Sequence, residues 1–162
     1  MFKFVKHLNQ SIMINWNDVI RFTKNGSPVP DKRVEKTEEE WKAILTSEQF
    51  RITRLKGTEP AGSGSFCNSH ETGKYNCVCC NAPLFDSTIK FNSLTGWPSF
   101  TQPIKENAIK YLKDKSYGMF RVEVVCNVCD AHQGHVFPDG PEPSGLRYCI
   151  NSASINLEKQ TA

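Results

Sequence analysis

Two Cys-x-x-Cys motifs constrain the fold of this chain more than any other feature of its sequence. Residues 81–125 separate them, and turn-forming residues follow each motif, Asn81 to Pro83 after the first and Asp130-Ala131 after the second. Each motif brings two sulfur atoms to one tight turn, and four thiolates complete the tetrahedral coordination of Zn²⁺. The pattern predicts a structural zinc ion that joins distant parts of an open β structure. The expected ligands are Cys77, Cys80, Cys126 and Cys129.

Three points keep alternatives open for these cysteines. A Cys-x-x-Cys motif is also typical of thioredoxin-like redox pairs, although those pairs belong to a βαβ context that the sequence does not show. The gap between the motifs is longer than the usual zinc-ribbon spacing. Cys79 lies inside the first motif and could replace either neighbour as a ligand, but the standard spacing favours Cys77 and Cys80.

The length and charge of the chain exclude several classes of protein. Its 162 residues are enough for one domain with a substantial core. The formal net charge of +3 is too small to indicate nucleic-acid binding by itself. No apolar stretch approaches the roughly 20 residues that cross a bilayer. We therefore expect neither a nucleic-acid nor a membrane partner. A monomer is expected as well, although none of these observations bears on the oligomeric state.

The cysteine count indicates a reducing compartment. Seven cysteines is an odd number, which a secreted fold held only by disulfides would not favour. The N-terminal stretch also lacks the apolar segment of a secretory signal, because polar residues interrupt it. We therefore expect reduced thiols and a cytoplasmic location. Two lysines and no acidic residue precede Asp18, so organelle targeting by the N-terminal segment stays open.

The first part of the chain divides into an extension and a helical segment. Residues 1–36 mix apolar clusters with turn signals, and we interpret them as an N-terminal extension of unknown role ahead of a domain at 37–162. Thr37, with a glutamate three residues later, has the pattern of a capping box and predicts a short helix. A second short helix is expected to begin near Ser47 and to end at Gly57.

The rest of the chain is expected to be mainly β. Residues 60–72 are rich in Gly and Ser and lack periodicity, which predicts a mobile loop, and Cys67 lies in it. From Tyr75 onward, short apolar runs alternate with Gly, Pro, Asn and Asp, which is typical of β-strands joined by long turns. The clearest expected strands span 89–91, 121–126 and 148–155.

A strand-like run at 147–152 carries the strongest candidate nucleophile. Because side chains alternate along a strand, Arg147, Cys149 and Asn151 are expected to share one face. A guanidinium beside a thiol favours the nucleophilic thiolate. A buried, unreactive cysteine is the alternative. A face of Arg, Cys and Asn is a poor match to a dry core, so the pattern favours a reactive Cys149.

Two histidines lie between the second cysteine motif and Cys149. His132 and His135 form an HxxH pattern that could bind metal with the nearby cysteines, or could support the turn. A third interpretation is proton transfer beside Cys149, because a thiolate that attacks an oxidised group needs an acid for the leaving oxygen. Trp97 lies in a rigid aromatic turn, where it either packs in the core or offers its face to a methyl group or a sulfur atom.

Five segments of the chain share a pattern with one known family. They are GTEP at 57–60, YNCVCCNAPLF at 75–85, KFNSLTGWPSF at 90–100, residues 116–122, and residues 125–154, which end in HVFPDGPEPSGLRYCINSAS. Together these segments resemble the methionine-R-sulfoxide reductases, the MsrB family. The last segment is long and highly specific. The resemblance covers about residues 38–157.

The resemblance implies a fold, a reaction and a set of site residues. The implied fold is mainly β, with two small antiparallel sheets, short N-terminal helices and a zinc site made of four cysteines. Residues 37–162 would form a catalytic domain that reduces methionine-R-sulfoxide, in oxidised proteins or free, and the HxxH pattern would serve catalysis. The implied nucleophile is Cys149, and the residues that bind and protonate the sulfoxide oxygen are His135, Asp139 and Arg147. The implied substrate-binding and supporting positions are Trp97, His132 and Asn151.

The family's reaction also requires a second thiol and an external reductant. Attack on the sulfoxide would leave a sulfenic acid on Cys149, a resolving thiol would condense with it, and thioredoxin or a similar dithiol would reset the enzyme. Many members carry the resolving cysteine two residues before the tryptophan, where this chain has Thr95. We expect Cys67 to replace it, because Cys67 lies in a flexible loop outside both motifs. Cys79, or a reductant that attacks the sulfenic acid directly, are the alternatives.

A second departure from the family lies between the two histidines, and two other classes of function compete with the reductase. Gln133 stands where the family commonly has Leu, and the sequence does not reveal its effect. A zinc-ribbon binding module would require basic or aromatic residues near the motifs, but the surroundings of 77–80 are nearly neutral. A zinc redox sensor would leave His135, Asp139 and Arg147 without a role.

Overall fold

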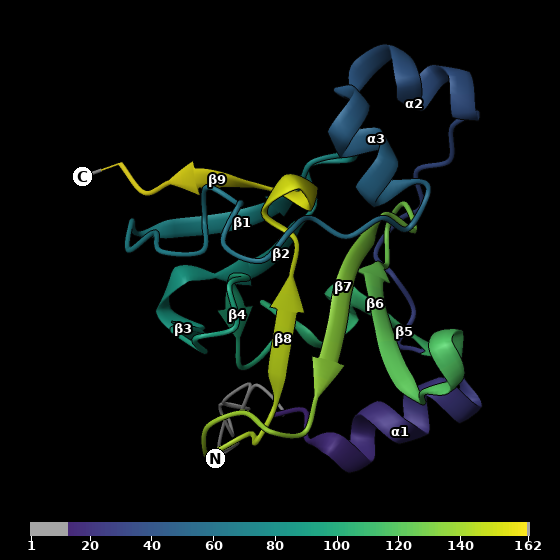
Figure 1. Cartoon of the computed structure of the whole chain (residues 1–162). Helices are drawn as coiled ribbons and strands as arrows, with labels where there is room; N and C mark the ends of the chain where they lie inside the picture. The colour runs from purple at the N-terminus through teal and green to yellow at the C-terminus, as the bar shows by residue number, and fades with distance from the viewer. Residues whose placement is uncertain (1–12, 162) are drawn as a thin grey trace, which may run out of the picture.

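The computed structural model describes residues 13–161, which form two antiparallel β-sheets with three α-helices (Figure 1). The smaller sheet has the strand order β2-β1-β9, and the larger one has the order β3-β4-β8-β7-β6-β5. The helices are α1 (Trp16–Asn25), α2 (Glu38–Ile44) and α3 (Ser47–Thr53). The strands are β1 (Gly73–Cys77), β2 (Pro83–Asp86), β3 (Lys90–Phe91), β4 (Ser99–Phe100), β5 (Ile109–Asp114), β6 (Arg121–Cys126), β7 (His132–Phe137), β8 (Arg147–Ile150) and β9 (Ile155–Lys159). The short 3₁₀ helices are η1 (Ser87–Ile89), η2 (Glu106–Ala108), η3 (Ser116–Gly118) and η4 (Ser152–Ser154).

The predicted fold class is confirmed. The described residues are mainly β, the two sheets are antiparallel, and the α-helices lie in the N-terminal part of the chain. In Figure 1, α2 and α3 lie beyond the start of β7, whereas α1 lies along the opposite end of the larger sheet beside β5. Within residues 13–161, no helix has both the length and the apolar character needed to cross a membrane.

Aromatic side chains connect the two sheets. Tyr75 on β1 and Phe85 on β2 both contact Phe100 on β4, and the Phe85 and Phe100 rings stack at 4.4 Å. Phe85 also packs edge-on against Tyr148 of β8, with ring centroids 5.7 Å apart. All four side chains are fully buried, and such pairs stabilise a fold beyond the area that they bury. Because Tyr148 is held in this core, its neighbour Cys149 points to the other face of the larger sheet.

The two helices of the predicted helical segment begin at their capping residues. Thr37 caps α2 and Thr46 caps α3, each by accepting a backbone N–H from the residue three positions later. The prediction that the second helix extends to Gly57 is wrong, because α3 ends at Thr53. The Gly57 N–H instead donates to the carbonyl oxygen of Arg51 at 3.0 Å, which turns the chain out of the helix.

The prediction of one strand over 148–155 is wrong as well. The run splits into β8, which ends at Ile150, and β9, which begins at Ile155. Between them, the Ser154 hydroxyl and the Ser154 N–H both donate to the carbonyl oxygen of Asn151, at 2.7 and 3.1 Å. These bonds close η4, the turn that carries the chain from the larger sheet to the smaller one.

Residues 13–36 pack against the larger sheet. Asn15 caps α1, and the helix buries Phe22, whose ring stacks on Tyr111 of β5 at 5.4 Å. Tyr111 in turn shares a 2.7 Å hydrogen bond with the hydroxyl of Tyr148 on β8. This segment therefore reaches the core through aromatic contacts. The division into an extension at 1–36 and a domain at 37–162 stays a prediction, and residues 1–12 lie outside the described residues.

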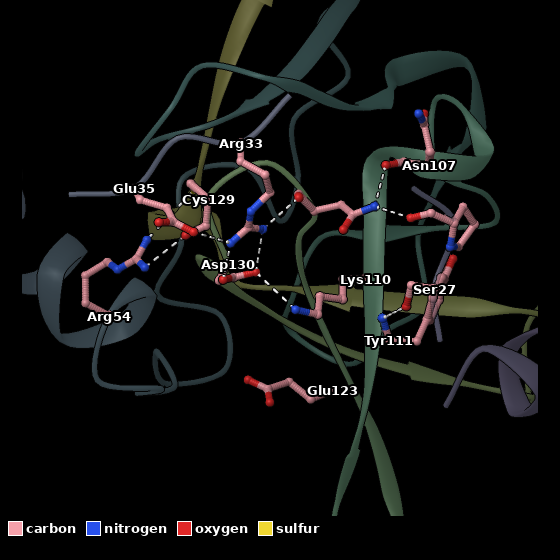
Figure 2. Close-up of polar contacts among 12 residues, drawn as sticks. Ser27, Arg33, Glu35, Arg54, Asn107, Lys110, Tyr111, Glu123, Cys129 and Asp130 are labelled. Atoms are coloured by element: carbon pink, nitrogen blue, oxygen red, sulfur yellow. Dashed lines mark hydrogen bonds and ion pairs between the residues drawn. The ribbon is translucent and has the colours of Figure 1, made fainter. Parts of the chain in front are cut away.

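The later part of this segment contacts the turn that follows β6. Figure 2 shows the Arg33 guanidinium on both carboxylate oxygens of Asp130, and it also donates to the carbonyl oxygen of Asn127 at 2.9 Å. Lys110 of β5 approaches the same Asp130 carboxylate, at 3.5 Å. Arg33 and Lys110 together hold the pKa of Asp130 below its ordinary value. The N-terminal segment thus supports a turn that carries two of the predicted metal ligands.

We predict that Phe22→Ala destabilises the protein. Phe22 is only 7% exposed, so truncation leaves a cavity against Tyr111, and a loss of about 3 kcal/mol in the free energy of unfolding is expected. Val29→Ala is the control, because Val29 is 83% exposed. Urea unfolding of both variants measures the difference. Equal midpoints for Phe22→Ala and the parent would show that α1 adds nothing to the stability of the domain.

Candidate active site and metal centre

The four cysteines predicted as metal ligands lie together where the two sheets meet. Their sulfur atoms are all within 4.8 Å of one another. Cys77 Sγ lies 3.7 Å from Cys129 Sγ, and Cys80 Sγ lies 3.6 Å from Cys126 Sγ. Cys77 ends β1 and Cys126 ends β6, so the cluster ties the smaller sheet to the larger one. Cys79, the alternative ligand, is not a member of this cluster among the described residues.

This donor set fits a metal ion that prefers thiolate ligands. A tetrahedral zinc ion with Zn–S bonds of about 2.3 Å would place its sulfur atoms about 3.8 Å apart. The measured separations of 3.7 and 3.6 Å are close to that value. Three of the four cysteines are buried. The cluster could therefore hold a metal ion with little rearrangement.

Hydrogen-bond donors surround the sulfur cluster. Gln133 donates from Nε2 to Cys77 Sγ at 3.6 Å, and its side chain is fully buried. Arg54 donates to Cys129 Sγ at 3.8 Å and to the Cys129 carbonyl oxygen at 2.9 Å (Figure 2). N–H groups that point at sulfur stabilise its thiolate form and orient metal ligands. A leucine at position 133 could not make this contact, which gives the Gln133 departure a structural consequence.

Cys149 lies on β8 between two partner strands. It faces Ser99 across β4 and His135 across β7, while Arg147 faces Phe137. Arg147 and Cys149 are half-buried, whereas Tyr148 and Ile150 are buried, which is the alternation expected from the sequence. Directly opposed side chains have Cβ atoms about 5 Å apart, so His135 and Cys149 are neighbours on one face.

Glycine at position 134 permits this close approach of β7 to β8. A Cβ atom on Gly134 would lie 2.0 Å from the carbonyl oxygen of Cys149. That oxygen belongs to the backbone and cannot move away without disturbing the strand pair. Gly134 therefore sets the distance between the histidine strand and the cysteine strand.

Burial and charge act in opposite directions on the Cys149 thiol. Burial raises the pKa of Cys149 above its ordinary value, and this effect outweighs the Arg147 charge and a Thr95 hydrogen bond, which both lower the pKa. The expectation that Arg147 favours the thiolate has the correct direction, but Arg147 does not act alone. The thiolate at this position depends on the polar groups around it.

Arg147 is fixed by two contacts. Its Nε and Nη2 atoms donate to the Asp139 carboxylate at 2.8 and 3.0 Å, and its guanidinium lies 4.4 Å above the Phe137 ring. Hydrogen bonds from Arg147, aided by its charge, hold the pKa of Asp139 below its usual range. Asp139 thus orients Arg147, which leaves the guanidinium beside Cys149 in a defined position.

His135 is paired with Asp114, a residue that the sequence analysis did not single out. His135 Nε2 lies 2.7 Å from Asp114 Oδ2. Burial by itself would raise the pKa of Asp114, but hydrogen bonds from Ser116 and His135 hold it well below its usual range. An ionised carboxylate only accepts hydrogen bonds, so the hydrogen lies on Nε2 and the other ring nitrogen is left for proton exchange. Burial lowers the pKa of His135, and Asp114 partly opposes this shift.

His132 lies deeper than His135 and has its own carboxylate. His132 Nδ1 lies 2.6 Å from Glu123 Oε2, and both side chains are buried. Lys56 donates to the other oxygen of Glu123 at 3.2 Å. The rings of His132 and His135 lie 5.7 Å apart, edge to face. His132 is therefore placed to support His135 rather than to reach the metal cluster, since its described contacts are with Glu123 and His135.

Glu59 joins the remaining predicted positions, Trp97 and Asn151. The Trp97 indole N–H donates to the Glu59 carbonyl oxygen at 3.0 Å, and the Glu59 N–H donates to Asn151 Oδ1 at 3.0 Å. Asn151 also donates to the Gln133 carbonyl oxygen at 3.1 Å. Asn151 is buried and lies past the end of β8, so it fastens β8 to β7 and to the Glu59 loop. Trp97 is half-buried, which leaves part of its ring accessible.

Cys67 lies in a separate region from Cys149. Residues 60–72 contain neither helix nor strand, and the Lys90 ammonium donates to the Cys67 carbonyl oxygen at 3.2 Å. Cys67 lines a cavity of about 270 Å³ together with Lys90 and Phe91 of β3. Cys67 and Cys149 both carry free thiols, and β4 separates β3 from β8. The structure therefore shows no bond between these two cysteines.

The sequence analysis missed several contacts at this site. Three of them lie beside the histidines and Cys149: Asp114 on His135, Glu123 on His132, and the Thr95 hydroxyl on Cys149. Glu123 carried a visible signal, because it is the only charged residue in the apolar run 122–126. The other two depend on the register of β5 and on the path of the turn before β4. Local sequence patterns do not report either of these.

The chain is similar to a known protein family and to named proteins of that family. The SelR domain model matches residues 45–159. A protein of Saccharophagus degradans named peptide methionine sulfoxide reductase MsrB is 59% identical over 127 residues, which are 78% of this chain and 95% of the relative. A protein of the same name from Pseudomonas fluorescens is 56% identical over 126 residues, which are 78% of this chain and 97% of that relative.

These matches define the class and then the family of the protein. The matched segment contains the four-cysteine cluster and all of β1 to β9, so the chain is a SelR-domain protein. It belongs to the MsrB family of peptide methionine sulfoxide reductases and is an oxidoreductase, as the sequence analysis predicted.

We predict that Cys126→Ser loses bound metal and thermal stability. Removing one of four thiolates weakens the cluster that ties β6 to β1, and a fall in melting temperature on the order of 10 °C is expected. Cys79→Ser is the matched control, because Cys79 lies in the same turn as the first motif but outside the cluster. Elemental analysis and calorimetry measure both quantities. Equal metal content and melting temperature in Cys126→Ser and the parent would contradict the metal assignment.

Proposed function

We propose that this chain reduces methionine-R-sulfoxide, in oxidised proteins or as the free amino acid, with Cys149 as the nucleophile. The observation that carries the proposal is the position of Cys149 directly opposite His135 on β7, with the Arg147 guanidinium on the same face. The thiol of Cys149, the imidazole of His135 and the charge of Arg147 thus lie on one face of the larger sheet, where a substrate could contact all three. The family relationship supports the same reaction, because the relatives are named for it.

The proposed first step transfers the sulfoxide oxygen to Cys149. The Cys149 thiolate attacks the sulfoxide sulfur and forms a transient S–S bond, while protonated His135 delivers its proton to the oxygen. The hydroxyl group then moves to the Cys149 sulfur, and the substrate S–O bond and the transient S–S bond both break. The sulfoxide is reduced to methionine and Cys149 is oxidised to a sulfenic acid. Arg147, held by Asp139, attracts the sulfoxide oxygen through its fixed charge. Asp114 raises the pKa of His135 and so favours the protonated donor, against the effect of burial.

The substrate-binding roles follow from exposure and packing. Trp97 is half-buried and tethered through its indole N–H, so its ring is a fixed apolar surface for the methyl group of the substrate. The His132 ring packs edge to face against the His135 ring and supports its orientation. Asn151 holds the end of β8 against β7 through its bond to the Gln133 carbonyl oxygen. Each of these residues acts by fixing a position that the reaction uses.

The metal in the cysteine cluster is proposed to be a structural zinc ion. Four thiolates complete its coordination and leave no open position for substrate, which is typical of structural sites. Cys77, Cys80, Cys126 and Cys129 would hold it, and bound zinc would supply folding energy and no chemistry. The chain's own residues on β7 and β8 carry the reaction.

The proposed second step resolves the sulfenic acid with Cys67. The Cys67 thiol condenses with Cys149–SOH to form a disulfide and water, and thioredoxin or a similar dithiol then reduces that disulfide by exchange. Disulfide geometry requires the two Cα atoms to come within about 7 Å. Movement of the 60–72 segment toward β8 is therefore part of this step.

We predict that the purified, reduced protein turns over the R epimer of a methionine sulfoxide derivative with dithiothreitol, and leaves the S epimer unchanged. Cys149→Ser should lose at least about 1000-fold in rate, because it removes the attacking thiolate. Cys79→Ser is the matched control and should keep parental turnover. Product formation by chromatography measures each rate. Absence of turnover on both epimers from metal-loaded protein would contradict the proposal.

We predict that Cys67→Ser keeps turnover with dithiothreitol but loses most of its turnover with thioredoxin. Loss of the resolving thiol leaves the sulfenic acid open to small dithiols and prevents the disulfide that thioredoxin reduces. Adding Thr95→Cys to Cys67→Ser should restore disulfide formation, because Thr95 Oγ1 already lies 3.9 Å from Cys149 Sγ. Full thioredoxin-driven turnover in Cys67→Ser alone would rule out Cys67 as the resolving residue.

A further inference from the structure

Three hydroxyl groups form a continuous chain that ends at the Cys149 sulfur. Ser99 Oγ lies 2.7 Å from Ser93 Oγ, and Ser93 Oγ lies 2.8 Å from Thr95 Oγ1. Thr95 Oγ1 lies 3.9 Å from Cys149 Sγ. Ser99 is also the partner of Cys149 between β4 and β8. The hydrogen-bond chain therefore starts at Ser99 and ends at Cys149, which are paired across β4 and β8.

The turn that carries this chain is held in place from two sides. The Trp97 N–H approaches Thr95 Oγ1 at 3.5 Å, and the Gly62 N–H donates to the Gly96 carbonyl oxygen at 2.7 Å. Gly96 has a φ of +93°, and a Cβ atom there would lie 2.8 Å from the Ala61 Cβ, so only glycine fits without rearrangement. Thr95 is thus presented to Cys149 by a defined backbone rather than by a free loop.

The hydrogens of the chain can be arranged in two ways. Each hydroxyl carries one hydrogen and two lone pairs. With a neutral thiol, Cys149 donates to Thr95, and each hydroxyl donates to the next as far as Ser99, which donates to the Trp97 carbonyl oxygen at 3.1 Å. With a thiolate, every hydrogen points the other way: Ser99 donates to Ser93, Ser93 to Thr95, and Thr95 to the sulfur. No heavy atom moves between the two arrangements.

We propose that Ser99, Ser93 and Thr95 form a reorienting hydrogen-bond chain, which turns its protons toward Cys149 when the thiol ionises and so stabilises the thiolate. Hydrogen bonds in a chain polarise one another, and a charged acceptor strengthens each link. Ser99, the end of the chain farthest from Cys149, is fully buried. Its hydroxyl group therefore cannot replace its hydrogen bond to Ser93 by one to water. These three are positioning residues, because they act through the sulfur of Cys149.

The hydrogen-bond chain favours ionisation of the Cys149 thiol, which the burial of this thiol opposes. Burial raises the pKa of the Cys149 thiol, and the Arg147 charge opposes this from one side only. Thr95 adds a donor from a different strand connection, the turn before β4. Many family members carry the resolving cysteine at position 95. In this protein Thr95 occupies that position, and its hydroxyl group stabilises the thiolate that attacks the sulfoxide. This role rests on the proposed function of Cys149 as the nucleophile.

The test is the pH dependence of Cys149 alkylation by iodoacetamide, followed in the tryptic peptide 148–159, which contains no other cysteine. Thr95→Val removes the hydroxyl with little change of shape, and its alkylation midpoint is expected to move up by about one pH unit. Thr95→Ser keeps the hydroxyl and is expected to keep the parental midpoint. Ser93→Ala cuts the chain one link away and is expected to give a smaller upward shift.

Ser144→Ala is the control for loss of a buried hydroxyl. Ser144 donates to the Thr101 carbonyl oxygen at 2.9 Å and lies outside the chain, so its removal should leave the midpoint unchanged. A parental midpoint in both Thr95→Val and Ser93→Ala, or equal shifts in Thr95→Val and Thr95→Ser, would overturn the proposal. If Thr95→Val does not fold, Ser93→Ala decides. Alkylation involves no sulfoxide, so failure of the reductase proposal is a separate result.

Discussion

The four-sulfur cluster is the constraint on which the arrangement of the site depends. It ties the turn after β1 to the turn after β6, which belong to different sheets. The strand that leaves the second turn is β7, which carries both histidines. Strand β1 pairs with β9, which follows β8 after the short turn η4. Fixing these two turns therefore fixes both strands of the His135–Cys149 pair. Gln133, which donates to Cys77 Sγ from β7, makes the connection direct.

The two faces of β8 have different environments: one is buried in the aromatic core, and the other carries polar and ionisable side chains. Tyr148 and Ile150 are fully buried and hold the strand in the aromatic core. Arg147 and Cys149 alternate with them on the other face, where the proposed reaction would use a charge and an ionisable thiol. Burial that makes the strand rigid also works against ionisation of the thiol. Polar groups of Arg147 and Thr95 oppose part of this effect, which favours Cys149 in its proposed role as the nucleophile.

Local patterns in the sequence predicted those features that depend on neighbouring residues. The spacing of the cysteines gave the cluster, the alternation at 147–150 gave the two faces of β8, and the expected strand at 121–126 matches β6. The error in the strand prediction arose where the chain changes sheet. Periodicity continues through 151–154, but the bonds of Ser154 to Asn151 turn the chain there, so the expected strand becomes two.

Long-range pairings were beyond such patterns for a physical reason. Asp114 reaches His135 because β5, β6 and β7 are aligned in register, and no local motif encodes that alignment. Gln133 was visible as a departure, but its target, Cys77, is distant in sequence and close only through the sulfur cluster. Thr95 was visible as the loss of a cysteine, while its contact with Cys149 depends on the turn around Gly96. The sequence thus identified Gln133 and Thr95 as unusual residues, but it did not identify the residues that they contact.

The most direct test of the central claim is a single-turnover experiment without reductant. The reduced protein is mixed with an excess of methionine-R-sulfoxide, and a sulfenic-acid reagent such as dimedone is added at once. Mass spectrometry then examines the peptide that contains Cys149. The account predicts about one equivalent of methionine and a dimedone adduct, or a disulfide, on Cys149. Release of methionine with Cys149 left as an unmodified thiol would contradict it.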